Sequence, residues 1–197
     1  MNEENAKLAR IKKSSSVGKK ISNILAAILV VATIVLAVTG IVFLADKGSI
    51  ESELSKAVAS GAISEPSDKI GHVSAMSIEL PDAKEIKTSI PALREALDAR
   101  PYTIGYGIYM LTMSVVMVMA VVLLKIIASG FATIEKEANP FTDAVIKKVT
   151  IVMIIISVVM CFTVGAAFGG VGAIATWLIH SVMDYGRTLQ IQSDETL

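Results

Sequence analysis

His180 and Asp184 are two ionisable residues at the end of an apolar stretch near the C-terminus. They lie four residues apart, so a helix places them on one face, with Trp177 one turn before and Arg187 one turn after. Ionisable residues inside a membrane are costly and commonly functional, which raises the hypothesis of a proton relay or ion site. The other apolar stretches hold no acidic residue or histidine to complete such a site. We therefore expect His180 and Asp184 to hold the helix end by a local hydrogen bond.

Other residue patterns that carry chemistry are missing from the sequence. It has no Gly-rich phosphate loop, no zinc-ligand spacing and no serine in a nucleophile context. The single cysteine, Cys161, lies in an apolar stretch, where the thiolate is disfavoured and the thiol is unreactive. The sequence predicts no catalytic residue, no metal, no cofactor and no enzymatic activity.

The elements that carry these residues are long apolar helices. Apolar residues form 53% of the chain and the mean hydropathy is +0.66, more than one soluble core needs. Three runs without a charged residue each reach the roughly 20 residues that cross a bilayer, and the third is long enough for two helices. We place the break of the third run at Gly169 and Gly170. The expected spans are residues 21–45, 104–128, 148–168 and 170–186.

These spans predict an all-α membrane protein, a four-helix transmembrane bundle with a partly structured extracytoplasmic segment between the first and second helices. Residues 1–20 carry six basic side chains against two acidic ones, which predicts a cytoplasmic N-terminus. The first apolar run is too long for a signal peptide and lacks a cleavage site, so we read it as an uncleaved anchor. Four crossings then place the loop 129–147 and the tail 187–197 in the cytoplasm as well.

The segment 46–103 is too long for a simple connector and too polar to enter lipid. Its composition predicts a helix over 51–60 and a strand over 73–80. Ser89 and Pro91 form a helix-start signal for a second helix. Two interpretations stay open: a sensing cap on the helix ends, or a solvated loop without a specific role.

The loop before the third span contains a helix-start motif. Asn139 can cap a helix, and Pro140 is tolerated in its first turn because proline loses no hydrogen bond there. We expect the helix to run from Phe141 into the third span, with Phe141 as an interfacial anchor and Thr142 adding an acceptor. A binding role for this motif and a purely local role are both open.

The end of the chain is a polar, acid-ended tail that emerges directly from an apolar helix. Nothing in it is suited to catalysis, so we interpret it as a surface to be bound. Its candidate contact residues are Tyr185, Gly186, Leu189, Gln190, Ser193, Asp194, Glu195, Thr196 and Leu197.

Both motifs resemble those of a family of small bacterial membrane proteins, the domain of unknown function 2975 family. In that family an Asn-Pro-Phe-Thr segment precedes the third span, and a Tyr-Gly-x-x-Leu-Gln-x-x-Ser-Asp-Glu-Thr-Leu pattern closes the chain. The resemblance covers residues 137–197, whereas segment 46–103 is not matched to the family and the stretch after Thr142 is less basic than usual. It implies a bacterial cytoplasmic membrane and a small helix-turn-helix regulator as the partner.

The small residues Gly165, Gly169 and Ala173 are spaced by four and predict close helix packing, within one bundle or in a homo-oligomer. The formal net charge is zero, so no overall field recruits nucleic acid, and the bilayer is the expected surrounding. Two functions follow from the sequence. The first is a membrane-bound interaction or regulatory partner, and the alternative is a small transport, immunity or channel-accessory subunit.

Overall fold

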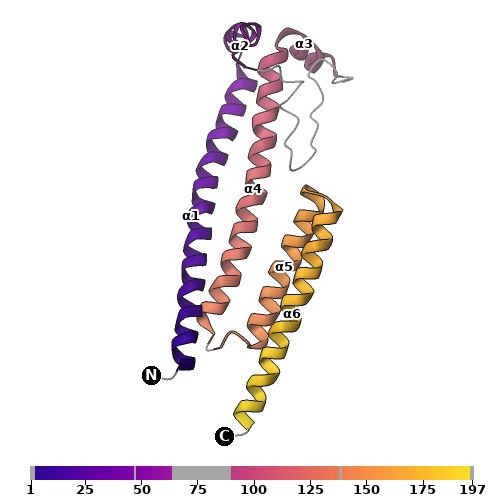
Figure 1. The fold of residues 1–197 in the computed structure, drawn as a ribbon. Helices are drawn as coiled ribbons and strands as arrows, with labels where there is room; N and C mark the ends of the chain where they lie inside the picture. The colour runs from indigo at the N-terminus through magenta and orange to yellow at the C-terminus, as the bar shows by residue number, and fades with distance from the viewer. Residues whose placement is uncertain (1–2, 47, 64–89, 138, 196–197) are drawn as a thin grey trace. The chain divides into compact units, whose positions relative to one another are not determined.

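The computed structural model describes residues 3–46, 48–63, 90–137 and 139–195, and all regular structure in these ranges is helical (Figure 1). The helices are α1 (Glu3–Ala45), α2 (Ser49–Ala59), α3 (Pro91–Ala99), α4 (Pro101–Lys136), α5 (Asp143–Thr163) and α6 (Ala166–Glu195). The strand expected over 73–80 lies outside the described residues.

Four of these helices, α1, α4, α5 and α6, are long and apolar enough to cross a membrane. A helix suits this environment because it pairs its backbone amides and carbonyls internally, where lipid offers no partner. The prediction of an all-α protein with four spans is confirmed.

The spanning helices are longer than the sequence predicted. Helix α1 begins at Glu3, so residues 3–20 continue the helix of the first expected span, and α4 continues to Lys136 instead of ending near residue 128. Lysine, arginine and alanine are good helix formers, and an established helix adds residues without a second nucleation cost. The connection between α4 and α5 is consequently much shorter than the expected loop 129–147.

The break in the third apolar run lies at Gly165, not at Gly169 and Gly170. Helix α5 ends at Thr163 and α6 begins at Ala166. Gly165 has a φ of 129°, a region that side chains with a Cβ rarely adopt, so a glycine is needed at this turn. Gly169 and Gly170 are part of α6, which also includes most of the tail expected over 187–197.

The chain forms two compact units, which are described separately. Unit 1 comprises Met1–Ile28 and Ala120–Leu197, and unit 2 comprises Leu29–Met119. Helices α1 and α4 each contribute to both.

In unit 2, α1 and α4 pack at glycines. A Cβ on Gly40 would lie 3.0 Å from the carbonyl oxygen of Gly107, and a Cβ on Gly107 would lie 2.9 Å from Leu44. Such close approach is typical of membrane helices, which gain stability from van der Waals packing rather than from excluding water.

The N-terminus of α4 is held by a side chain from α2. The Glu51 carboxylate accepts hydrogen bonds from the Tyr102 amide (3.2 Å), the Thr103 amide (2.7 Å) and the Thr103 hydroxyl (2.6 Å). These amides have no partner within their own helix, and a carboxylate also suits the positive end of the helix dipole. Nearby, Leu97 of α3 and Ile104 of α4 form a small buried core. Helices α2 and α3 therefore both contact the N-terminal end of α4.

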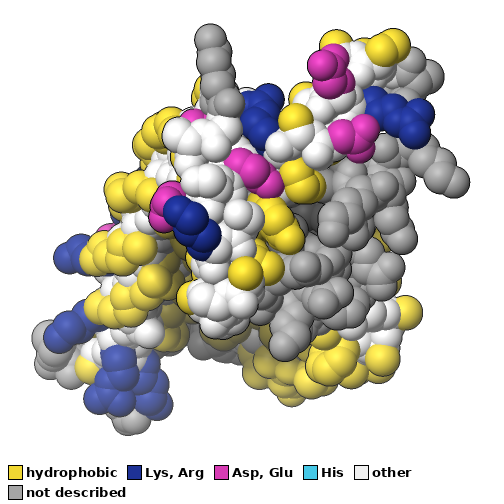
Figure 2. Space-filling model, turned by 90° about the horizontal axis from the view of Figure 1, so that it is seen from above, with side chains coloured by type: hydrophobic (Ala, Val, Ile, Leu, Met, Phe, Trp, Pro, Cys, Tyr) yellow, Lys and Arg dark blue, Asp and Glu magenta, His cyan; other side chains and the backbone are white. Residues whose placement is uncertain are grey.

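Helix α2 has its own carboxylate cap. Asp46 accepts hydrogen bonds from the Ser49 hydroxyl (2.6 Å) and from the amides of Gly48 (2.8 Å) and Ile50 (3.0 Å). The Ser49 hydrogen bond, with those from the amides, lowers the pKa of Asp46 below its ordinary value. Figure 2 looks onto the end of unit 2 that carries α2 and α3 and shows acidic and basic side chains there. This end of unit 2 is suited to water.

The two expected helices of segment 46–103 are confirmed as α2 and α3. Pro91 lies in the first turn of α3, as the start signal predicted, although the N-cap residue is Ile90 and provides no side-chain hydrogen bond. Ser89, the expected cap, lies outside the described residues.

In unit 1, α5 and α6 form an antiparallel hairpin. Gly169 lies against Cys161, and a Cβ on Gly172 would lie 2.6 Å from the Ser157 hydroxyl. The predicted stripe of Gly165, Gly169 and Ala173 is thus wrong in part: Gly165 forms the turn, and Gly172 rather than Ala173 joins Gly169 at the close contact.

The Glu51→Ala substitution tests the contact between α2 and α4. It should lower the free energy of unfolding by about 1–3 kcal/mol, because the fully buried Thr103 would lose its hydrogen-bond acceptor. Chemical unfolding in detergent measures the change. Glu53→Ala is the matched control, since Glu53 forms an exposed ion pair with Lys56. Equal losses in the two variants would contradict the capping role of Glu51.

Adjacent glycines of α6 provide a test of the hairpin contact. Gly169→Ala should destabilise the protein by about 1–3 kcal/mol, because the new Cβ would lie 2.9 Å from the Cys161 Cα and the backbones must separate. Gly170→Ala meets nothing within 4 Å and should be neutral or stabilising by up to about 1 kcal/mol. Thermal unfolding in detergent compares the stabilities of the two variants. If Gly170→Ala were the more destabilising substitution, α5 and α6 would pack differently.

Candidate functional site

The candidate site is the end of the α5–α6 hairpin opposite the Gly165 turn, called here the open end. Side-chain contacts show how the two helices are aligned: Ser157 lies 3.3 Å from Thr176 and Thr150 lies 3.0 Å from His180. Two turns further along, Arg187 reaches Asp143 in the first turn of α5. The hairpin therefore brings together two segments that lie far apart in the sequence.

The connection into α5 is shaped by two side-chain hydrogen bonds. The Asn139 side-chain oxygen accepts from the Phe141 amide at 2.9 Å, which forms a tight turn around Pro140. The Thr142 hydroxyl accepts from the Val145 amide at 3.4 Å, so Thr142 is the N-cap and α5 begins at Asp143. The motif does start a helix, but the prediction that Asn139 caps it and that Phe141 lies within it is wrong. Because the Asn139 side chain accepts from the amide two residues later, it closes a turn before the helix instead of capping it.

The two sequence motifs meet at Phe141 and Gly186. A Cβ on Gly186 would lie 2.6 Å from the Phe141 ring, so the ring rests directly on the α6 backbone. Phe141 thus anchors α6 to the loop before α5. The sequence suggested a membrane-interface role for this ring and did not predict the contact.

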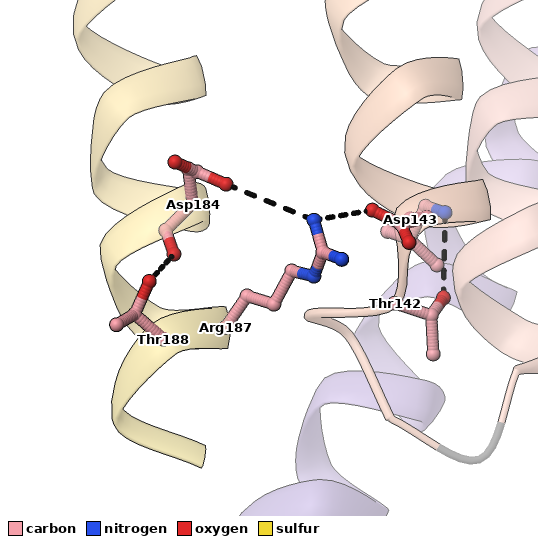
Figure 3. A network of polar contacts seen from close by, with 6 residues as sticks. Thr142, Asp143, Asp184, Arg187 and Thr188 are labelled. Carbon is pink, nitrogen blue, oxygen red and sulfur yellow. Dashed lines mark hydrogen bonds and ion pairs between the residues drawn. The ribbon is translucent and has the colours of Figure 1, made fainter. Parts of the chain in front are cut away.

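Arg187 connects α6 to the start of α5 (Figure 3). One guanidinium nitrogen lies 2.6 Å from the Asp143 carboxylate and 4.0 Å from that of Asp184. The Asp143 side chain is 74% exposed and that of Arg187 is 40% exposed. Water therefore screens the ion pair, and both groups are accessible to a binding partner.

Helix α6 continues beyond this ion pair to Glu195, which adds about two turns and roughly 12 Å. We call residues 188–195 the α6 projection. Large side chains are exposed at its base and along it: Tyr185 is 66% exposed, and Leu189 and Ile191 are each 47% exposed. Gln190 is half-buried, and the backbone of residues 193–195 is helical. Thr196 and Leu197 lie outside the described residues.

The expected hydrogen bond between His180 and Asp184 is replaced by other contacts. His180 Nδ1 lies 3.0 Å from the Thr150 hydroxyl of the neighbouring helix, and Asp184 faces Arg187 instead. A polar group of α5 lies opposite His180, and interhelical contact outweighs the local pairing that the spacing of four suggested.

Several hydroxyl groups in the spans are paired with their own backbone, as expected for helices in lipid. They donate to carbonyl oxygens three or four residues earlier, at Thr33, Thr39, Thr112, Ser114, Thr163 and Thr176. Within the ranges that the structure describes, no group of three or more His, Cys, Asp or Glu residues is placed to hold a metal ion. The open end offers exposed apolar side chains and an accessible ion pair, an arrangement suited to protein binding.

No family model, curated protein or solved structure matches this chain. The resemblance to the domain of unknown function 2975 family stays a prediction.

Sequence reasoning did not identify Asp143 and Arg187 as partners. The position of the hairpin turn in the sequence could have identified this pair, because the turn determines which residues of α5 and α6 lie opposite each other. With the turn placed at Gly169 and Gly170, the open end of the hairpin is out of register, whereas a turn at Gly165 places Asp143 opposite Arg187.

A double-mutant cycle on Asp143→Asn and Arg187→Gln tests whether the ion pair is accessible. We expect a coupling energy of about 0.2–1 kcal/mol that decreases with added salt, because both groups are in contact with water. The coupling energy is obtained from the free energies of unfolding, in detergent, of the unmodified protein, the two single variants and the double variant. A coupling above about 2 kcal/mol that salt leaves unchanged would instead indicate a buried structural lock.

Proposed function

We propose that this chain is a non-enzymatic membrane protein that binds a regulatory protein at the open end of the α5–α6 hairpin. The observation that carries the proposal is the α6 projection, which continues about two turns beyond the Arg187–Asp143 ion pair with exposed apolar side chains. A helix that only crosses the bilayer has no need of these turns, because the apolar part of α6 already spans it.

The exposed side chains support recognition by a groove on the partner. Tyr185 and Leu189 lie four residues apart and share a face of α6, a spacing typical of helices that insert into hydrophobic grooves. Tyrosine is also enriched among the residues that dominate binding energy. Phe141 and Arg187 hold the start of the α6 projection against the start of α5.

The resemblance suggests a small helix-turn-helix regulator as the partner. The tail contains Asp194 and Glu195, whose acidic side chains complement a basic DNA-binding surface. A regulator held there would be kept from DNA, and the chain itself would bind no nucleic acid. This mechanism places the open end and both termini in the cytoplasm, in agreement with the basic residues before the first span.

The alternative, a small transport, immunity or channel-accessory subunit, has less support. A groove of about 530 Å³ runs between α5 and α6, but its lining is almost entirely apolar. Its polar members have partners within the hairpin: His180 lies 3.0 Å from the Thr150 hydroxyl, and the hydroxyls of Ser157 and Thr176 donate to the carbonyl oxygens of Met153 and Gly172. Such a groove provides no polar path for a solute.

The test is co-purification in mild detergent with a Tyr185→Ala/Leu189→Ala variant. Both side chains are exposed, so the fold should persist. The amount of a small DNA-binding protein recovered with the variant should be at least tenfold lower than with the full chain, which corresponds to a loss of about 1.4 kcal/mol or more of binding free energy. Mass spectrometry of the bound proteins measures the change.

The matched control is Trp177→Ala/Ile174→Ala, which removes an aromatic and an aliphatic side chain that are also exposed on α6 but lie within the span. Its recovery of the partner should equal that of the unmodified chain. Recovery of the same proteins by the full chain, by both variants and by a chain ending at Arg187 would refute the proposal.

A further inference from the structure

Near its N-terminus, helix α1 packs through one face against other described residues of unit 1 and exposes the opposite face. Residues with small side chains, Ser15, Ser22 and Ala26, are at most 6% exposed and recur at helical spacing. In the same unit, Lys19 forms an ion pair with Glu135 of α4 at 2.8 Å, and Asn23 accepts a hydrogen bond from Lys125. These contacts define the face of α1 that turns toward α4.

The other face combines cations with apolar side chains in a fixed order. Its members are exposed and follow one another at spacings of three and four, so they form one stripe. We call them the outer stripe: Arg10, Lys13, Val17, Lys20, Ile24 and Ile28. The cations Arg10, Lys13 and Lys20 lie in its N-terminal part with Val17 between them, and beyond Lys20, the last charge before the uncharged run, the stripe is apolar.

The three cations of the outer stripe differ from Lys19. Among the described residues, Arg10, Lys13 and Lys20 have no carboxylate within ion-pair distance, whereas Lys19 is held by Glu135. They are therefore accessible to an external anion.

The dimensions of α1 place these cations at the lipid headgroups. The helix has 43 residues and is about 65 Å long, roughly twice the hydrocarbon thickness of a bilayer. With the uncharged run in the hydrocarbon, Lys20 lies at headgroup depth, and Lys13 lies about 10 Å further out on the same face. The long side chain of Lys13 can extend back toward the phosphates.

We propose that the outer stripe of α1 is a binding site for an anionic phospholipid of the surrounding leaflet. Lys20 and Lys13 bind the headgroup phosphate, and the acyl chain lies along Ile24 and Ile28. The order of charges and apolar residues along a single face matches the order of phosphate and hydrocarbon in a lipid. This site is independent of the partner surface on α6.

The test is native mass spectrometry of the full chain in detergent, titrated with phosphatidylglycerol or with phosphatidylcholine. The unmodified protein should bind the first phosphatidylglycerol more tightly than the first phosphatidylcholine, and added salt should reduce the difference. Lys20→Gln should reduce this preference about fivefold, Lys13→Gln less, and Lys20→Arg should preserve it.

Two controls remove the same charge elsewhere. Lys19→Gln changes the neighbouring residue on the packed face, and Lys56→Gln changes an exposed lysine on α2, so both should retain most of the preference. Circular dichroism confirms that each variant keeps its helices. The proposal is overturned if phosphatidylglycerol shows no advantage, or if the Lys20, Lys19 and Lys56 lysine-to-glutamine variants lose it equally. Binding of an oligonucleotide with the same dependence on Lys20, and no lipid preference, would also overturn it by assigning the stripe to nucleic acid.

Discussion

Close contact between helix backbones is the constraint on which the rest of the structure depends. Lipid surrounds the spans, so exclusion of water does not drive the helices together, and they must gain stability from packing at short distance. Gly40 and Gly107 allow this for α1 and α4, and Gly169 and Gly172 allow it for α5 and α6. At each of these points a side chain would force the backbones apart. The glycines thereby set the register of each helix pair.

The register of the hairpin in turn determines which polar groups meet. Once Gly169 lies against Cys161, Thr150 faces His180 and Asp143 faces Arg187, and α6 must extend past the start of α5. The projection of α6 is a direct consequence of unequal helix lengths on either side of the Gly165 turn. A packing requirement within the membrane therefore determines which side chains are presented beyond it, including those proposed to bind a partner.

Charges outside the spans divide into those used for structure and those left accessible. Glu51 and Asp46 accept hydrogen bonds from free amides at the N-termini of α4 and α2, and Lys19 forms an ion pair with Glu135. The cations of the outer stripe and the exposed Arg187–Asp143 pair face water or lipid headgroups. This division explains why a chain of zero net charge can still carry local surfaces of strong and specific charge.

Long uncharged runs determined the fold class, because a helix of about 20 apolar residues pairs its backbone groups internally in lipid, and Pro91 indicated a helix start because the first turn tolerates proline. The sequence also indicated Asn139–Thr142 and the C-terminal tail as special segments. It did not reveal that Phe141 rests on Gly186, that Thr142 rather than Asn139 is the cap, or that Thr150 is the partner of His180. Nor could it choose between Gly165 and the Gly169–Gly170 pair as the turn, since all three glycines tolerate one. Tertiary structure decided that choice, because Gly169 is needed where α6 meets Cys161 and a residue without a Cβ must stay at that contact.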